Sequence, residues 1–505
     1  MNNPLSRNEF LADAGLPSVD RIAVVDIGSN SVRLVVYNRA ARALIPLFNE
    51  KIFCGIGRKI ASTGRLDVDG VQKAIEALSR FRELIASTRA VQVEAVATAA
   101  VRDAQNGREF VAHAEDVLKV PIRILSGEEE GRLSASGVRA GIPEASGIVG
   151  DLGGGSLELV KIMRGEVGDA VTLPLGPLRL MDQDFPTLKA TRAYVDDTLG
   201  KVGWLKSARG QDFYMVGGSW RNLARLHLDR REYPLTILHQ YEIESDEAAE
   251  FCRSVSKLGK KSLEGIAGIA KKRLEGLPLA ALVLERVIEL SACRNVIVSA
   301  YGLREGIVAE AQGSAFLSID PVFAVAQDLC VQMARDPALC AELVDWTAPL
   351  FKWETPEQRR LRIAACWLSD IAWRKHPEYR SEVGFNHVLS EQFSGLNHFG
   401  RAFLALTLHE RYPEGRETAE FIAVRKFLPE EARDRARILG LALRLGIALA
   451  GACAGTLPQC PLSIDGDKVR LQVPKHMRAL TGETIGKRLE AVADALERSH
   501  RISLI

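Results

Sequence analysis

DIGSNSVRLVV at residues 26–36 and DLGGGSLELVK at residues 151–161 decide the fold of this chain. The two stretches align without a gap, and the same residue occurs in both copies at Asp26/Asp151, Gly28/Gly153, Ser31/Ser156, Leu34/Leu159 and Val35/Val160. Each stretch joins two apolar, strand-like segments through a glycine-rich turn. An internal repeat of this kind predicts two related domains that face each other across a cleft, with one turn entering the cleft from each side.

The residues around the first copy alternate between the periodicities of strands and helices. Apolar runs at 22–26, 32–38 and 43–48 predict a small antiparallel meander. Further along, the pattern predicts helices over 70–87 and 108–118 and from Glu128, with strands over 91–97 and 122–125. This βββαβαβα order predicts a layered α/β domain of the ribonuclease-H-like type.

The second copy begins a similar series, with predicted strands at 170–176 and 213–217, and the composition becomes helical after about residue 301. LSIDGDKVRLQV at 462–473 predicts a hairpin that turns near Asp465 and Gly466. We therefore expect an N-terminal tail and three domains. The tail covers residues 1–20, the first α/β domain 21–140, the second 141–314, and a helical C-terminal domain with a terminal β-hairpin region 315–505.

The composition is that of a globular protein without a general affinity for nucleic acid. Of the 505 residues, 47% are hydrophobic and 26% charged, so there is enough apolar surface for several cores. The 66 basic and 64 acidic residues leave a net charge of only +2, which argues against a nucleic-acid partner but permits a local basic groove.

The sequence predicts neither a membrane segment nor a disulfide framework. Leu445–Ile464 is uncharged, but Pro458 and Pro461 interrupt it, which favours a buried helix that runs into a loop. The first twenty residues lack the apolar core of a signal peptide. The eight cysteines form no CxxC pair, which disfavours disulfides and a zinc site. We expect a cytoplasmic protein.

The turns DIGSNS (26–31) and DLGGGS (151–156) are suited to binding phosphate. Glycine lets backbone N–H groups approach an anion, and the serine hydroxyls add donors. The carboxylates of Asp26 and Asp151 would need a divalent cation, most plausibly Mg²⁺, to act beside phosphate. A polar hairpin turn without a ligand explains either copy alone equally well, but two copies in one register favour function.

Three further segments allow both a functional and a structural interpretation. VGGSW (216–220) places Gly217, Gly218 and Ser219 between a strand and a helix, where an anion could bind or where Ser219 could simply cap the helix. Arg102, just beyond a strand end, could hold phosphate oxygens or be an ordinary surface arginine. In SGEEEGR (126–132), Ser126 and Glu129 fit a capping box, yet a carboxylate there could also activate water.

Several familiar catalytic motifs are absent from the sequence. There is no GxxxxGK[ST], HExxH or GxSxG pattern, which removes the simplest P-loop, zincin and α/β-hydrolase interpretations. Asp370 in the C-terminal domain is preceded by Ser369 and not by histidine, so a metal-dependent HD phosphohydrolase centre is not expected there.

Taken together, these segments resemble the exopolyphosphatase/guanosine pentaphosphate phosphohydrolase (Ppx/GppA) family of the actin-like, sugar-kinase and Hsp70 superfamily. Over about residues 20–310 the family's motif order is matched by VDIGSNSVRLVVY, ATAAVRDA, ILSGEEEGRL, GDLGGGSLELV and VGGSWRNLA. The resemblance implies duplicated actin-like domains with a cleft between them, followed by a helical HD-like C-terminal domain that serves binding and dimerisation, so a homodimer is expected.

The resemblance also implies roles for individual residues. It places the glutamate that activates the attacking water on Glu129, with Glu158 as its partner carboxylate. Asp151 and Glu158 would contact Mg²⁺. The residues expected around the phosphates are Asp26, Gly28, Ser29, Asn30, Ser31, Arg33, Arg102, Gly153, Gly154, Gly155, Ser156, Gly217, Gly218 and Ser219.

The leading hypothesis is therefore an exopolyphosphatase that releases orthophosphate from the end of inorganic polyphosphate with water, Mg²⁺ and Glu129. The chain of phosphates would run toward a basic cluster in the C-terminal domain, which a solvated helix face explains equally well. That cluster comprises Arg359, Arg360, Arg362, Arg374 and Lys375. The alternatives are hydrolysis of guanosine pentaphosphate (pppGpp), an ATP-driven switch or kinase, and a scaffold without catalytic activity.

Overall fold

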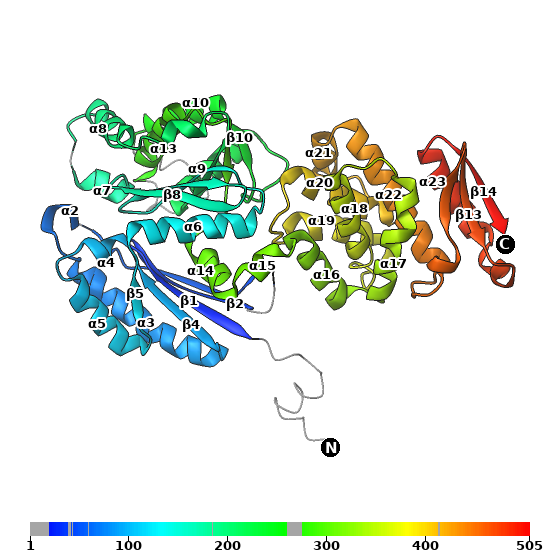
Figure 1. Cartoon of the computed structure of the whole chain (residues 1–505), viewed down its shortest axis with the longest axis horizontal. Helices are drawn as coiled ribbons and strands as arrows, with labels where there is room; N and C mark the ends of the chain where they lie inside the picture. Colours follow the sequence, from blue (N-terminus) through cyan, green and yellow to red (C-terminus); the bar gives the residue numbers. More distant parts are fainter. Residues whose placement is uncertain are drawn as a thin grey trace, which may run out of the picture.

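The computed structural model of the chain describes residues 20–38, 42, 44–58, 60–183, 185–259, 275–412 and 415–505, without the side chains of Ala61 and Ser314. Nearly all of the predicted N-terminal tail (1–20) and residues 260–274 lie outside these ranges. Two α/β lobes lie one above the other, and a helical region extends from them and ends in a small sheet (Figure 1).

The first lobe is built on a mixed sheet with strand order β3-β2-β1-β4-β5. β1 and β2 pair antiparallel, and β1 pairs with β4 in parallel. β1 carries the apolar run RIAVVDI and has four consecutive fully buried residues, as expected for a central strand covered on both faces. Its elements are β1 (Arg21–Ile27), β2 (Ser31–Asn38), β3 (Pro46–Phe53), α2 (Ile60–Thr63), α3 (Val68–Thr88), β4 (Gln92–Ala97), α4 (Ala99–Asp103), α5 (Gly107–Leu118) and β5 (Ile122–Ile124).

The second lobe repeats this topology and adds one strand, giving the order β10-β11-β9-β6-β7-β8. Without the added edge strand β10, the order β8-β7-β6-β9-β11 matches the order β3-β2-β1-β4-β5 of the first lobe. The duplication predicted from the two glycine-rich stretches is therefore confirmed. Its elements are β6 (Gly147–Leu152), β7 (Leu157–Met163), β8 (Glu166–Leu173), α7 (Pro177–Asp182), α8 (Leu188–Gly200), β9 (Asp212–Val216), α9 (Gly218–Arg230), β10 (Glu242–Glu244), α10 (Ser245–Ser256), α13 (Leu277–Ser291) and β11 (Asn295–Val298).

Two helices cross between the lobes and position the cleft. α6 (Gly127–Gly141) follows the first sheet but packs against β6, β7 and β8 of the second, while α14 (Leu303–Gln312) follows the second sheet and packs on β1 of the first. The two helices approach closely because glycine has no Cβ at the contact. A Cβ at Gly137 would overlap the Gly302 carbonyl, and one at Gly306 would overlap the Leu133 carbonyl. Each lobe is thus tied to the other by a helix.

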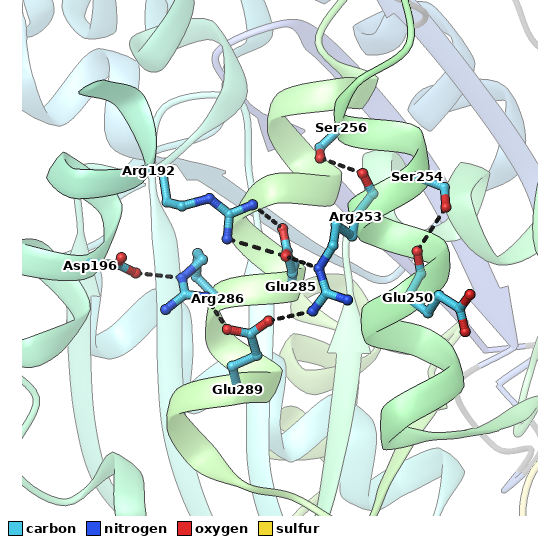
Figure 2. Close-up of polar contacts among 9 residues, drawn as sticks. All are labelled: Arg192, Asp196, Glu250, Arg253, Ser254, Ser256, Glu285, Arg286 and Glu289. Carbon is cyan, nitrogen blue, oxygen red and sulfur yellow. Dashed lines mark hydrogen bonds and ion pairs between the residues drawn. The ribbon is translucent and has the colours of Figure 1, made fainter. Parts of the chain in front are cut away.

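Ion pairs hold together the helices that cover one face of the second sheet. Glu285 of α13 is fully buried and accepts hydrogen bonds from Arg192 of α8 and Arg253 of α10. Figure 2 shows these contacts continuing through Glu289 and Arg286. No part of this network belongs to the site described below.

The C-terminal region is helical, as expected, and its core runs from the helices into the terminal sheet. The predicted hairpin is present as β12 and β13, and a further strand, β14, joins β13 in parallel. Among the described helices, none has the length and apolar character needed to span a bilayer. The elements are α15 (Ser314–Ser318), α16 (Pro321–Met333), α17 (Pro337–Thr347), α18 (Pro356–Leu368), α19 (Arg380–Ser390), α20 (His398–Arg411), α21 (Ala419–Phe427), α22 (Glu430–Leu449), β12 (Leu462–Asp465), β13 (Lys468–Val473), α23 (Glu483–Ala495) and β14 (Ser499–Leu504).

Candidate active site

The two glycine-rich turns have the same local geometry and meet. The Gly28 N–H donates to the Ser31 carbonyl at 3.0 Å, and the Gly153 N–H donates to the Ser156 carbonyl at 3.0 Å. A Cβ placed on Gly155 would lie 3.4 Å from Ser29 Oγ, so the turns are in contact. Turns of this kind form concavities that bind anions, and their meeting point is a candidate phosphate site.

A cavity of about 230 Å³, which we call the cleft, opens where the turns meet. It is lined by most of the residues expected from the sequence, namely Asp26, Gly28, Ser29, Asn30, Ser31, Arg33, Asp151, Gly153, Gly154, Gly155, Ser156, Gly217, Gly218 and Ser219. Arg102, Glu129 and Glu158 are not among the lining residues. Four charged residues that the sequence did not single out are: Lys51, Glu130, Arg221 and Arg304.

The third turn reaches the cleft through a backbone that requires glycine. Gly217 has a φ of 106°, and a Cβ there would lie 2.4 Å from the Leu152 carbonyl oxygen. Gly217 is itself the residue that precedes α9, and Ser219 lies in the first helical turn and makes no capping hydrogen bond. The structural interpretation of Ser219 as a cap is therefore wrong, and the start of α9 faces the cleft.

The duplicated hairpins place different charges opposite their aspartates. Asp26 pairs across β1 and β2 with Arg33, whereas Asp151 pairs across β6 and β7 with Glu158. Cross-strand neighbours lie about 5 Å apart, so opposite charges attract and like charges repel. The charges of Asp26 and Arg33 therefore cancel in the first hairpin, whereas Asp151 and Glu158 place two acidic groups together in the second.

Asp26 has a protein cation beside it where a metal ion was expected. Arg304 of α14 donates to Asp26 Oδ2 at 3.0 Å. Burial alone would lower the pKa of Arg304, but Glu305 and Asp26 outweigh it and raise that pKa above its ordinary value. Arg304 therefore stays charged at the edge of the cleft.

The structure corrects the position of the glutamate that faces the cleft. Glu129 is exposed, and its carboxylate accepts a hydrogen bond from the Ser126 N–H at 2.8 Å, which completes the capping box at the start of α6. That bond lowers the pKa of Glu129. Glu130, one residue further around the helix, is 8% exposed and lines the cleft. Among the three consecutive glutamates, Glu130 is the one placed to act on a ligand there.

Burial, together with the charge of Asp151, raises the pKa of Glu130 to about 7. Arg102 opposes it, since its Nη1 donates to Glu130 Oε2 at 3.2 Å. Arg102 thus reaches the site through Glu130 and does not line the cleft. A carboxylate with a pKa near neutrality can take a proton from water at physiological pH, so the arrangement fits a general base.

Glu158 lies behind the cleft and is 1% exposed. Neither of its carboxylate oxygens has a hydrogen-bond partner among the described residues. Burial, together with Glu130 and Asp151, raises the pKa of Glu158 well above its ordinary value. Asp151 also has a raised pKa through burial, although Ser134 donates a hydrogen bond to it. A carboxylate that is buried without partners is stable only when it is protonated or when a cation lies beside it.

The acidic side chains of the site are suited to a cation that takes most of its ligands from water and substrate phosphates. Within the described ranges, no group of three His, Cys, Asp or Glu side chains is arranged to hold a metal ion alone. Mg²⁺ usually binds one or two carboxylates and takes the rest of its ligands from substrate phosphates and water. The oxygens of Asp151 and the unpartnered oxygens of Glu158 fit that role.

A second cavity of about 340 Å³, which we call the basic pocket, continues from the cleft. The two cavities share Arg33, Lys51, Gly218, Arg221 and Arg304, and the basic pocket adds Arg225. Burial, together with repulsion from the nearby Arg304 and Arg221, lowers the pKa of Arg33 to about 10. Such clustered guanidinium groups favour a bound polyanion.

Two residues of the basic cluster expected in the C-terminal region are held in ion pairs. Arg360 is held by Asp320 and by the Gly395 carbonyl, and Arg362 is buried against Glu354. Asp320 lies 40 residues from Arg360, so the local sequence did not reveal that pair, whereas Glu354 lies only eight residues before Arg362. Asp370 is also held in ion pairs, with Arg335 at 2.7 Å and Arg411 at 3.4 Å.

Two family models match the chain. Residues 35–315 match the Ppx/GppA phosphatase family, and residues 322–505 match the C-terminal domain of exopolyphosphatases. Exopolyphosphatase 1 of Mycobacterium tuberculosis is 25% identical over 319 residues, which cover 60% of this chain and 92% of that protein. Exopolyphosphatase 2 of the same organism is 26% identical over 322 residues, which cover 59% of this chain and all of that protein.

Solved structures agree with this grouping for the two lobes. The Ppx/GppA enzyme of Aquifex aeolicus has 25% sequence identity and a TM-score of 0.51, covering 58% of this chain and 100% of that one. An exopolyphosphatase from Cytophaga hutchinsonii has 22% identity and a TM-score of 0.53, covering 58% of this chain and 98% of that one. The latter shows the fold alone.

Proposed function

Because the chain belongs to the Ppx/GppA phosphatase family, we propose that it is an exopolyphosphatase that hydrolyses the terminal phosphoanhydride bond of inorganic polyphosphate. One observation carries the choice of substrate: the cleft runs into the basic pocket through shared lining residues, three of them arginines. A linear polyanion needs a long positive path, whereas a compact phosphate ester needs only the cleft.

In this proposal the chain's own residues bind the terminal phosphate and activate water. The N–H groups of the two glycine-rich turns and the start of α9 surround the phosphate oxygens. Glu130 orients a water molecule and accepts its proton as the oxygen bonds to phosphorus. The role expected for Glu129 passes to Glu130, because the Glu129 carboxylate is used in the capping box.

Asp151 and Glu158 would hold Mg²⁺, which when bound neutralises charge on the reacting phosphate. Arg304, Arg33 and Arg221 bind the phosphates that follow. The homodimer expected from the family resemblance remains a prediction.

Adjacent glutamates give the sharpest test of this mechanism. Glu130→Gln should lower kcat for orthophosphate release from long-chain polyphosphate by about 10² to 10⁴, the usual cost of losing a general base. Glu129→Gln is the matched control, and it should stay within a few fold of wild type because only a helix cap is changed. Both variants should show the same circular dichroism. Loss of activity in Glu129→Gln, with activity kept in Glu130→Gln, would refute the assignment.

The alternative substrate is pppGpp, and the buried side-chain amide of Asn222 in the basic pocket is the observation that favours it. Asn222 Nδ2 has no hydrogen-bond partner among the described residues and belongs to a residue that lines that pocket. Such an amide can bind a nucleobase edge. A comparison of kcat/KM on long-chain polyphosphate and on pppGpp decides between the two. An ATP-driven switch or kinase would instead leave polyphosphate intact.

A further inference from the structure

A third cavity lies on the other side of the general base. It has a volume of about 300 Å³ and is lined by Arg102, Asp103, Gly127, Ser156, Thr172, Leu173, Pro174 and Arg179; we call it the Arg179 pocket. Since one water molecule takes about 30 Å³, the pocket has room for orthophosphate together with several waters.

The Arg179 pocket adjoins the cleft at the ion pair between Arg102 and Glu130. Ser156 lines both cavities. Glu130 lines the cleft, Arg102 lines the Arg179 pocket, and their charged groups are 3.2 Å apart. We call this ion pair, which includes the general base of the proposed mechanism, the partition.

The pocket has more positive than negative charge of its own. Arg102 Nε lies 3.3 Å from Asp103 Oδ1, and Arg179 Nη2 pairs with the other oxygen of the same carboxylate. One aspartate therefore serves two guanidinium groups. Arg179 Nε and Thr172 Oγ1 are buried and have no hydrogen-bond partner among the described residues. These groups can donate to an oxyanion.

The proposed reaction forms its product on this side. The attacking water and the leaving oxygen lie roughly in line on opposite sides of phosphorus. Glu130 therefore marks the side away from the remaining polyphosphate, which occupies the cleft and the basic pocket. Orthophosphate formed against Glu130 is adjacent to the Arg102 partition, while the remaining chain blocks the way it entered.

Proton transfer in the proposed reaction weakens the Arg102–Glu130 ion pair as the product forms. The water oxygen bonds to the terminal phosphorus, the bridging P–O bond breaks, and its electron pair stays with the shortened chain. The proton of the water passes to the Glu130 carboxylate, which becomes neutral. Neutral Glu130 attracts Arg102 less, just as a new anion appears beside it.

We propose that the Arg179 pocket is an orthophosphate site through which the product leaves while polyphosphate remains in the cleft. This inference rests on the proposed function. Arg102 and Arg179 bind the released anion in turn, and Asp103 competes with it for both guanidinium groups. Release by this route lets the shortened chain advance without dissociating.

The test measures orthophosphate binding with the cleft already filled. Glu130→Gln protein, which mimics the neutral glutamate, is saturated with long-chain polyphosphate and titrated with orthophosphate by calorimetry. Adding Arg179→Gln should weaken orthophosphate affinity by about tenfold or more, since a charged hydrogen bond is lost. Adding Asp103→Asn should strengthen it, because the competing charge is removed. Arg478→Gln, at an exposed position between β13 and α23 in the C-terminal region, is the control and should change nothing.

The opposite effects expected for Arg179→Gln and Asp103→Asn distinguish a binding site from a purely structural contact. If the Arg179–Asp103 pair only joined α7 to α4, both substitutions would act in the same direction. Equal orthophosphate affinity in all variants, with hydrolysis of polyphosphate intact in the Glu130 wild-type background, would overturn the inference. Absence of hydrolysis in the wild-type protein would instead overturn the proposed function.

Discussion

Glu285 and Glu158 are both completely buried acids of the second lobe, yet their surroundings differ. Glu285 is paired with Arg192 at 2.7 Å and Arg253 at 3.0 Å within the helices over the sheet (Figure 2). Glu158 has no hydrogen-bond partner for either oxygen among the described residues, and its cross-strand neighbour is Asp151. The fold supplies cations to a buried acid that serves packing and supplies none to the buried acid that lies behind the candidate phosphate site.

The difference has an energetic meaning. A buried carboxylate that is ionised without partners costs free energy, and a protein keeps such a group only where something else compensates. At Glu285 the two arginines compensate in the folded chain itself. At Glu158 the compensation must come from a proton or from a bound cation, which links the stability of the second hairpin to occupancy of the site.

The same substitution at the two positions should therefore have opposite effects, and Glu285→Gln should have the larger one. Glutamine keeps the shape but leaves Arg192 and Arg253 without a counter-charge. We expect the free energy of unfolding to fall by about 2 to 3 kcal/mol, less than for a fully buried pair because both arginines are partly exposed to water. Urea unfolding at pH 8, followed by circular dichroism, measures it. A change of less than 0.5 kcal/mol, on the order of a surface substitution, would show that the network adds nothing.

Glu158→Gln should instead stabilise the protein at high pH. The folded state holds the pKa of Glu158 above its ordinary value of 4.5, so the folded form favours the proton. Stability from this group is full below that ordinary pKa and is lost as the pH rises through the folded pKa. We expect the free energy of unfolding of the variant to exceed that of wild type at pH 8 and to equal it at pH 4, where the acid is mostly protonated in both states.

Unfolding of wild type and Glu158→Gln across this pH range, without added metal, provides the check. The matched Glu285→Gln variant controls for the general effect of amide substitution. Destabilisation of Glu158→Gln at pH 8 would mean that the ionised acid has partners in solution. Polyphosphatase activity of the variant should fall, because a buried acid that serves function at such a site lowers the stability of the folded protein.

The duplication and most of the cleft could be predicted from sequence because they depend on local patterns. The matched turns at Asp26 and Asp151 place their own backbone in the cleft, whatever packs around them. The choice between Glu129 and Glu130 depends on a rotation of about 100° around α6. The capping box already occupied Glu129, so that signal was available in SGEEE and favoured the next residue.

Other parts of the site depend on contacts between distant segments. Arg304 meets Asp26 across 278 residues, and no local pattern marks that pair. Asp320 likewise pairs with Arg360 from 40 residues away, whereas Glu354 lies only eight residues before Arg362, so only the first of these pairs was hidden from the local sequence. β14 was likewise missed because its partner β13 pairs with it in parallel after an intervening helix.

The pH dependence of activity tests whether Glu130 is the base. With a pKa of about 7, Glu130 is protonated and inactive at low pH, so kcat/KM should rise through pH 7 and then level off. Asp151→Asn should move this rise to lower pH, since the Asp151 charge helps to raise the pKa of Glu130. Initial rates from pH 5 to 9 at saturating Mg²⁺ measure both. A rise that stays near pH 7 in Glu130→Gln would assign it to another group.

Asp26→Asn should move the same rise in the same direction but by less. Asp26 also raises the pKa of Glu130, but it is the weakest of the causes, and Arg304 beside it offsets its charge. The two aspartates occupy equivalent positions of the repeat, so the comparison isolates the effect of their partners. Glu129→Gln, which leaves the cleft unchanged, is the control for the pH profile. Equal shifts in Asp26→Asn and Asp151→Asn would mean that Arg304 does not screen Asp26, and the first hairpin would then be as negative in its effect on the base as the second.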